Sequence, residues 1–256
     1  MKRRISNLLI LSLVISALAV CFRQEDLAGQ LAFVGARIQT GTSGSELTRA
    51  VVVIDPGHGG MDGGAQAGDG TCEKDINLAI SKMLKRKLTA DGVRVILTRS
   101  RDEGLYEPDA KGAIRTLKTQ DMKKRKQIID KADADLTISI HLNSFTQDPS
   151  VCGAQVFYPS QGDPAVVKRS RRAAKLMQDG FNETLNQQKD RGEMGKNDVF
   201  LLREAASPIV IAECGFLSNP ADLQNLKKKK YQEQIVKILH TSVCSYLQQK
   251  RPAKAQ

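Results

Sequence analysis

Short apolar runs alternate with amphipathic, helix-like segments along most of the chain, and this alternation constrains the fold more than any other feature. The run Val51–Ile54 is wholly apolar, which is typical of a strand covered on both faces. It is followed at Glu73–Thr89 by apolar residues at helical spacing. The alternation predicts strands at residues 51–54, 93–98, 136–140, 153–158, 199–202 and 209–213. We therefore expect an α/β fold: a single domain with a mixed, mostly parallel central sheet of about six strands flanked by helices.

The remaining segments complete this expectation. Further helices are predicted at residues 120–132, 165–185 and 231–247, and a short one starts at Asn219-Pro220. Residues 191–197 are rich in glycine and charge, and they predict a flexible loop near the functional edge of the sheet.

The N-terminus has the pattern of an export signal. Lys2-Arg3-Arg4 precede a mainly apolar stretch from Ile5 to Phe22, and Ala17-Leu18-Ala19 offers a cleavage site. The stretch is also nearly long enough to stay as a membrane anchor. We expect a signal peptide or membrane anchor at 1–22, a linker at 23–49, a folded domain at 50–249 and a tail at 250–256. The protein is then exported, either secreted or anchored outside the cytoplasmic membrane.

The net charge narrows the range of partners, and the cysteine content indicates the state of the thiols. A net charge of +11 favours anionic partners such as nucleic acid, phospholipid or the polymers of a bacterial wall. No nucleic-acid-binding motif accompanies the charge, so we expect no nucleic acid partner. The basic runs at 123–126 and 227–230 are interpreted as solvated helix faces. The five cysteines form no close pair and predict free thiols, although export leaves one disulfide open.

Four acid or imidazole side chains lie at or just beyond strand ends. His58 follows the first predicted strand, Glu73 opens the next helix, and His141 and Glu213 end two later strands. Ligands of open α/β sheets bind outside the carboxyl ends of the strands. Two imidazoles, a carboxylate and a spare carboxylate have the composition of a hydrolytic zinc site. Glu213 would be the general base of such a site.

Each of these residues also has a plain structural explanation. His58 could belong to a glycine-rich turn, and Glu73 could complement a helix dipole. His141 could be a core histidine, and Glu213 could pair with a lysine or arginine. A second catalytic alternative makes Cys214 a nucleophile.

His240 is interpreted as a packing or surface residue of the last helix.

Three segments, at residues 53–60, 138–143 and 213–219, resemble those of the zinc-dependent N-acetylmuramoyl-L-alanine amidases. The first contains the Asp-Pro-Gly-His-Gly-Gly sequence that these enzymes share. The resemblance runs from about Ala50 to Leu247 and implies a catalytic amidase domain. It also implies that His58, Glu73 and His141 bind one Zn²⁺ and that Glu213 is the catalytic acid/base. The reaction implied is hydrolysis of the amide between N-acetylmuramic acid and L-alanine of the peptidoglycan stem peptide.

Within this family the chain is most similar to the short members specific to sporulation and germination. That similarity implies removal of stem peptides in spore cortex before muramic-δ-lactam formation, in the forespore intermembrane space or cortex. The short interval from His141 to Glu213 leaves no room for a long inhibitory insertion, so a separate activator protein is expected. A vegetative autolysin and a catalytically silent, membrane-tethered wall-binding protein remain the alternatives.

Overall fold

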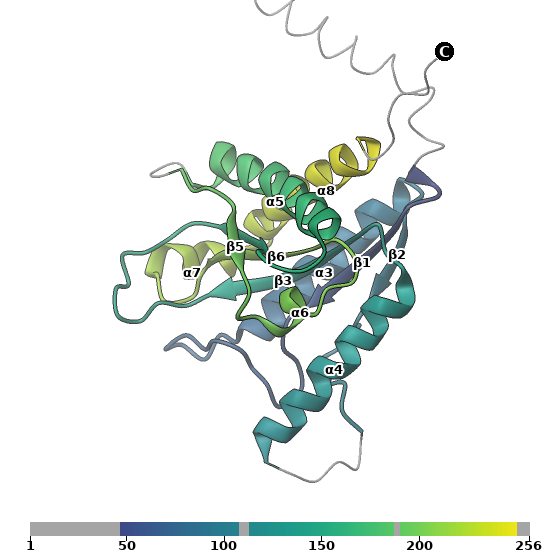
Figure 1. Cartoon of the computed structure of the whole chain (residues 1–256). Coiled ribbons are helices and arrows are strands. Elements are labelled where there is room, and N and C mark those ends of the chain that lie inside the picture. The colour runs from purple at the N-terminus through teal and green to yellow at the C-terminus, as the bar shows by residue number, and fades with distance from the viewer. Residues whose placement is uncertain (1–46, 108–112, 187–189, 250–256) are drawn as a thin grey trace, which may run out of the picture. The chain divides into compact units, whose positions relative to one another are not determined.

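A single mixed sheet organises the part of the chain that this computed structural model describes, residues 47–107, 113–186 and 190–249. The strand order is β2-β1-β3-β6-β4-β5, with β2, β1, β3 and β6 parallel and β4 antiparallel to β6 (Figure 1). The bounds are β1 Val51–Pro56, β2 Arg94–Leu97, β3 Leu136–Asn143, β4 Gln155–Pro159, β5 Met194–Lys196 and β6 Ile209–Phe216. The predicted α/β class and mixed, mostly parallel sheet are confirmed.

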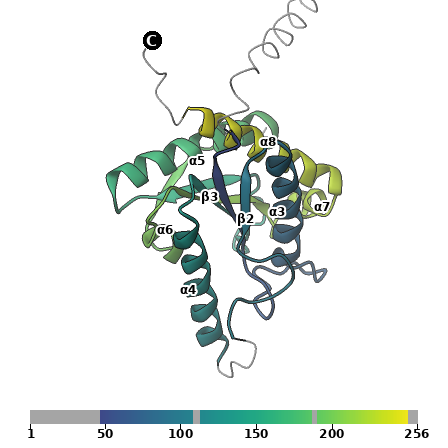
Figure 2. The ribbon, with the colours of Figure 1, turned by 90° about the vertical axis from the view of Figure 1, so that its right-hand side faces the viewer.

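Both faces of the sheet are covered, which explains the continuous apolar runs. In β1, Val52 and Ile54 belong to the larger hydrophobic core, whereas Val53 belongs to the smaller one on the other face. Helices α3 (Glu73–Ala90), α5 (Pro164–Thr184) and α8 (Lys229–Gln248) supply side chains to the larger core. Helices α4 (Ile114–Ala132) and α6 (Phe200–Arg203) supply the smaller one. Figure 2 shows α3 and α4 on opposite sides of β2.

Local signals set two helix starts. The Asp163 carboxylate accepts hydrogen bonds from two backbone N–H groups at the start of α5, and Pro164 occupies its first turn. Asn219 caps α7 (Pro220–Leu226) in the same way, with Pro220 as the first residue. The predicted helix start at Asn219-Pro220 is therefore correct.

Two predictions of local structure were wrong. Residues 199–202, predicted as a strand, contribute to the short helix α6, because a four-residue apolar run carries no periodicity that separates helix from strand. Leu201 and Leu202 are buried there as helix residues. The predicted loop at 191–197 contains β5, which pairs in parallel with β4. The sixth strand of the sheet is therefore β5 and not the segment at 199–202. Helix α4 also begins earlier than expected, at Ile114.

The predicted segment at 1–22 and the tail at 250–256 lie outside the described residues, as does most of the predicted linker. Within the described ranges, no helix combines the length and the apolar character needed to cross a bilayer. Three cysteines in these ranges, Cys72, Cys214 and Cys244, are free thiols.

Candidate active site

The parallel strands β1, β3 and β6 bring three of the predicted residues to one edge of the sheet. His58 lies two residues beyond β1, and His141 lies near the end of β3. Glu213 of β6 is the register partner of His141. Glu73 is the first residue of α3, the helix that follows β1 in the chain. Because parallel strands end at a common edge, residues far apart in sequence meet there.

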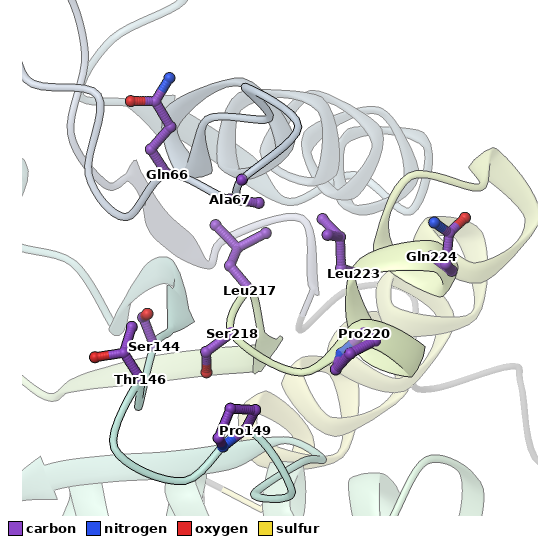
Figure 3. Close-up of a pocket in the computed structure, with 11 residues that line it drawn as sticks. Gln66, Ala67, Ser144, Thr146, Pro149, Leu217, Ser218, Pro220, Leu223 and Gln224 are labelled. Atoms are coloured by element: carbon purple, nitrogen blue, oxygen red, sulfur yellow. The ribbon is translucent and has the colours of Figure 1, made fainter.

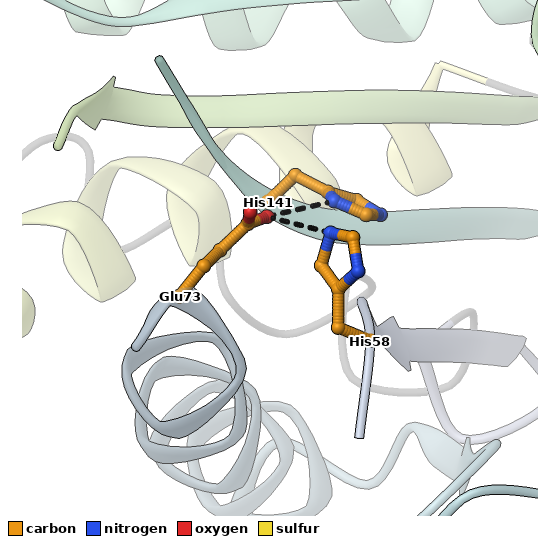
Figure 4. A group of neighbouring side chains, drawn as sticks. All are labelled: His58, Glu73 and His141. Carbon is orange, nitrogen blue, oxygen red and sulfur yellow. Dashed lines mark hydrogen bonds and ion pairs between the residues drawn. The ribbon is translucent and has the colours of Figure 1, made fainter. Parts of the chain in front are cut away.

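Glu73 points between the two imidazole rings (Figure 4). Its Oε1 atom lies 3.2 Å from His58 Nε2 and 2.9 Å from His141 Nδ1. The same carboxylate accepts hydrogen bonds from the backbone N–H groups of Leu142, at 3.0 Å, and Ala65, at 2.9 Å. Glu73 is only 3% exposed, so its carboxylate is held in one orientation by buried partners.

This donor set fits a tetrahedral metal ion. Adjacent nitrogen and oxygen ligands of tetrahedral zinc lie about 3.3 Å apart, given metal–ligand bonds of about 2.0 Å. The two Glu73–histidine distances, 3.2 Å and 2.9 Å, are close to this separation. The His58 and His141 rings are 4.9 Å apart between centroids and nearly perpendicular, at 79°. The three ligand atoms lie within 4.8 Å of one another.

Two glycines make this close approach possible. A Cβ atom on Gly57 would lie 2.3 Å from the His141 ring. One on Gly64 would lie 2.6 Å from both the His58 ring and the Glu73 carboxylate, and its φ of +70° also disfavours other residues. His58 itself has a φ of 60°, a region that non-glycine residues seldom adopt. The glycine-rich turn therefore shapes the site, and the turn and ligand interpretations of His58 are compatible.

Asp62 is a site residue that the sequence analysis missed. Its Oδ2 atom lies 2.9 Å from His58 Nδ1, the ring nitrogen that does not face Glu73, and its Oδ1 atom pairs with Lys118 at 2.7 Å. Burial lowers the pKa of His58, but hydrogen bonds to Asp62 and Glu73 outweigh it and raise the pKa to about 9. Such a carboxylate behind a histidine orients the ring of a metal ligand. The sequence signal that could have revealed Asp62 was an acidic residue four positions after His58.

A buried ion pair holds the turn that carries His58. Arg125, 1% exposed, donates hydrogen bonds to the Asp55 carboxylate and to the carbonyl oxygens of Pro56 and His58 at 2.6–2.7 Å. Burial raises the pKa of Asp55, but Arg125 and hydroxyl donors more than offset this and lower it to about 2. The interpretation of residues 123–126 as a solvated face was thus wrong for Arg125.

Arg99 secures the other side of the same turn. It is 2% exposed, and its guanidinium donates hydrogen bonds of 2.9 Å to the carbonyl oxygens of Pro56, Gly57 and Lys74. These contacts join the end of β1 to the first turn of α3, the two segments that carry His58 and Glu73.

Glu213 is a half-buried carboxylate with an uncommitted oxygen. Its Oε2 atom is shielded from solvent and has no hydrogen-bond partner, and within the described residues no lysine or arginine forms a salt bridge with it. Burial and, to a lesser extent, the Glu73 charge raise its pKa, while His141 opposes the shift. The ion-pair explanation of this residue is therefore not supported by the described contacts.

Cys214 does not have the surroundings of a nucleophile. It is fully buried, and its thiol lies 3.5 Å from the carbonyl oxygen of Ala212. Burial raises the pKa of Cys214 well above its usual range, which keeps the thiol protonated and unreactive.

A surface hollow lies beyond the ends of β3 and β6 (Figure 3). It has a volume of about 450 Å³ and is bordered by the loop before α3 and by the segments after β3 and β6. Gln66 in its wall is next to Ala65, which bonds to Glu73, and Ser144 is three residues beyond His141. Hydroxyl and amide side chains mix here with Leu217 and Pro149, so the hollow offers both polar and apolar contacts.

A His-Glu-His donor set with a free carboxylate, at the carboxyl edge of a mixed α/β sheet, defines a metallohydrolase-like class. The chain matches the N-acetylmuramoyl-L-alanine amidase family, Amidase_3, over residues 52–245 and belongs to it. The protein is therefore a cell-wall hydrolase with N-acetylmuramoyl-L-alanine amidase activity.

Particular relatives place it within the family. It is 32% identical to the germination-specific N-acetylmuramoyl-L-alanine amidase of Bacillus subtilis, over 80% of this chain and 82% of that protein. It is 31% identical to the amidase LytC of the same organism, over 76% of this chain but only 35% of LytC. A structural match with a TM-score of 0.73 and 35% identity is the CwlD amidase from Clostridioides difficile, in complex with the GerS lipoprotein; it covers 78% of this chain and 99% of CwlD.

Proposed function

We propose that the protein is a zinc-dependent amidase that cuts the bond between N-acetylmuramic acid and L-alanine of the stem peptide. His58, Glu73 and His141 hold one Zn²⁺, and Glu213 is the catalytic acid/base. One observation carries the proposal: Glu73 Oε1 lies 3.2 Å and 2.9 Å from the two ring nitrogens, at the edge where Glu213 has an uncommitted oxygen. This arrangement weighs against a catalytically silent wall-binding protein.

When bound, Zn²⁺ acidifies water and polarises the substrate carbonyl. Glu213 accepts the proton of the attacking water and delivers it to the leaving amine of L-alanine. Its raised pKa suits both steps, because a general acid/base works best with a pKa closer to neutral than that of an exposed carboxylate. Asp62 orients His58, and Glu73 is oriented by its buried hydrogen bonds.

The biological role we propose is maturation of spore cortex. The relative from Bacillus subtilis is described as germination-specific, and the chain aligns with 82% of its length. In that role, cleavage removes stem peptides before muramic-δ-lactam forms, a step needed for germination. The protein acts outside the cytoplasmic membrane, exported through a signal peptide or membrane anchor at 1–22, with a linker at 23–49 and a catalytic domain at 50–249. The partner is peptidoglycan, joined by a separate activator, since the structural relative CwlD is in complex with a lipoprotein.

The bond specificity is tested by mass spectrometry of purified peptidoglycan digested with the protein. Free stem peptides beginning with L-alanine, together with peptide-free glycan strands, are the expected products. The His141→Ala variant is the control, and it should release neither. Products cut between amino acids of the stem would instead identify a peptidase.

The cortex role is tested in the source organism with a Glu213→Gln allele. Spores of this strain should lack muramic-δ-lactam and fail to germinate, while vegetative growth and cell separation are normal. Chained vegetative cells with normal cortex would support the vegetative autolysin instead. Copurification from sporulating cells tests the activator: an exported partner protein should be retained on the wild-type chain.

A further inference from the structure

A second group of metal-binding side chains lies at the opposite end of α3 from Glu73. Asp91 follows the last residue of α3, and His240 and Cys244 occupy successive turns of α8, which packs beside it. Asp91 Oδ2 lies 2.6 Å from His240 Nε2 and 3.8 Å from Cys244 Sγ, and Sγ lies 3.7 Å from the same Nε2 atom. An 18-residue helix is about 27 Å long, so this group is remote from the catalytic edge.

The geometry separates this group from a catalytic Cys-His-Asp relay. In a relay, the acid and the nucleophile contact different nitrogens of the imidazole ring. Here Asp91 and Cys244 both face Nε2 of His240. An oxygen, a nitrogen and a sulfur therefore point to a single spot, as metal ligands do.

The separations agree with those of a tetrahedral site. Zinc bonds of about 2.3 Å to sulfur and about 2.0 Å to nitrogen or oxygen place the sulfur about 3.5 Å from each of the other ligands. The observed sulfur distances are 3.7 Å and 3.8 Å. Only the Asp91–His240 hydrogen bond, at 2.6 Å, must lengthen, to about 3.3 Å, to admit an ion. The Asp91 side chain is 40% exposed and can make this adjustment.

The surroundings favour a positive charge. Asp91 is the C-terminal cap of α3, where the helix dipole has its negative end. A thiolate and a carboxylate together balance a divalent ion, with the thiol proton released to solvent on binding. The partial exposure of His240 and Asp91 leaves a route for the ion and for water in a fourth position.

We propose that Asp91, His240 and Cys244 form a second metal site, for Zn²⁺ or another borderline divalent ion. A sulfur ligand beside an imidazole selects ions of this class over Mg²⁺ and Ca²⁺. The ion links the end of α3 to α8 and so acts as a structural crosslink. This site is independent of the proposed function, because it shares no residue with the catalytic edge.

Cobalt substitution tests the proposal, because of the two proposed sites, both within the described residues, this one alone includes a sulfur ligand. The full chain, purified in detergent without a histidine tag and kept reduced, is titrated with Co²⁺. The wild type should develop an intense near-ultraviolet sulfur-to-cobalt absorption band and bind about two ions per chain. Cys244→Ser should lose the band and one ion while keeping amidase activity. His141→Ala should lose the other ion and keep the band.

Cys152→Ser is the matched control, since Cys152 is also a partly buried cysteine. It should retain the band and both ions. His240→Ala provides an independent check, with at least a tenfold weaker band at subsaturating Co²⁺. The proposal is overturned if the wild type shows no sulfur-to-cobalt band, or if the band survives in Cys244→Ser. Either result leaves the proposed zinc chemistry of His58, Glu73 and His141 untouched.

Discussion

The two ends of α3 present the same kinds of side chain in very different surroundings. At the first residue, Glu73 is 3% exposed and held by backbone N–H groups, and two histidines from strand ends face it. At the far end, Asp91 is 40% exposed and meets His240 and Cys244 on one face of α8. In both groups the ligand atoms lie within 4.8 Å of one another, but only the first has a buried carboxylate held by backbone N–H groups.

This difference in burial and support suits the two groups to different tasks. A catalytic metal site needs ligands held in place without the ion, so that geometry is not rebuilt in each turnover. At the proposed zinc site, Arg125 and Arg99 hold the turn that carries His58. A structural site can order its ligands as it binds, because the ion stays. Substitutions in and around the group at Glu73 test this difference in support.

The largest effect is expected at Glu213. Glu213→Gln keeps the shape but cannot accept a proton, so turnover should fall by about 10³-fold or more. Zinc content should stay at the wild-type level, because the three proposed ligands are intact. Activity assays with metal analysis check both. Full activity in this variant would remove Glu213 from the mechanism. Cys244→Ser is the control and should have wild-type activity.

The next largest effect concerns the buried support. Arg125→Met leaves the Asp55 carboxylate without its charged partner, which should reduce the free energy of unfolding by about 3–5 kcal/mol. Lys124→Met, on the exposed side of the same helix, is the control and should change stability little. Urea denaturation measures both. Equal stability of the two variants would mean that this ion pair does not support the catalytic turn.

A smaller effect is expected at Asp62, which lies 2.9 Å from the ring of His58, one of the proposed ligands. Asp62→Asn should weaken zinc affinity at the catalytic edge by about 10–100-fold, as loss of a carboxylate behind a histidine ligand does. Competition with a chromophoric chelator measures this. Asp69→Asn, in the same loop but paired with Lys227 at the surface, should have wild-type affinity. The cobalt–sulfur band should be unchanged in both, since neither residue lies at the second site.

The smallest effect is a pH dependence of stability from Asp55. Its pKa in the folded protein is about 2, below the usual 3.8, so the ionised form stabilises the fold. That contribution, about 2 kcal/mol, is complete above about pH 4 and is lost as pH falls toward 2. Denaturation at a series of acidic pH values should show the loss in wild type and a shallower slope in Asp55→Asn. Identical slopes would contradict the assigned pKa.

Much of the catalytic edge could be predicted from the sequence, for a physical reason. Continuous apolar runs such as Val51–Ile54 are typical of strands covered on both faces, and parallel strands end at a common edge. Acid and imidazole residues placed after such runs, as His58, His141 and Glu213 are, must therefore lie near one another. The sheet class and the region of the site thus follow from local sequence patterns.

Other features depended on contacts between distant segments. The run at 199–202 has no periodicity, so only its packing decides that α6 is a helix. Arg125 lies in a run of basic residues, and only its approach to Asp55, 70 positions away, shows that it is buried. The pairing of Asp91 with His240 spans 149 positions. Local patterns report periodicity and chemistry, whereas burial and the meeting of remote side chains arise only when the chain has folded.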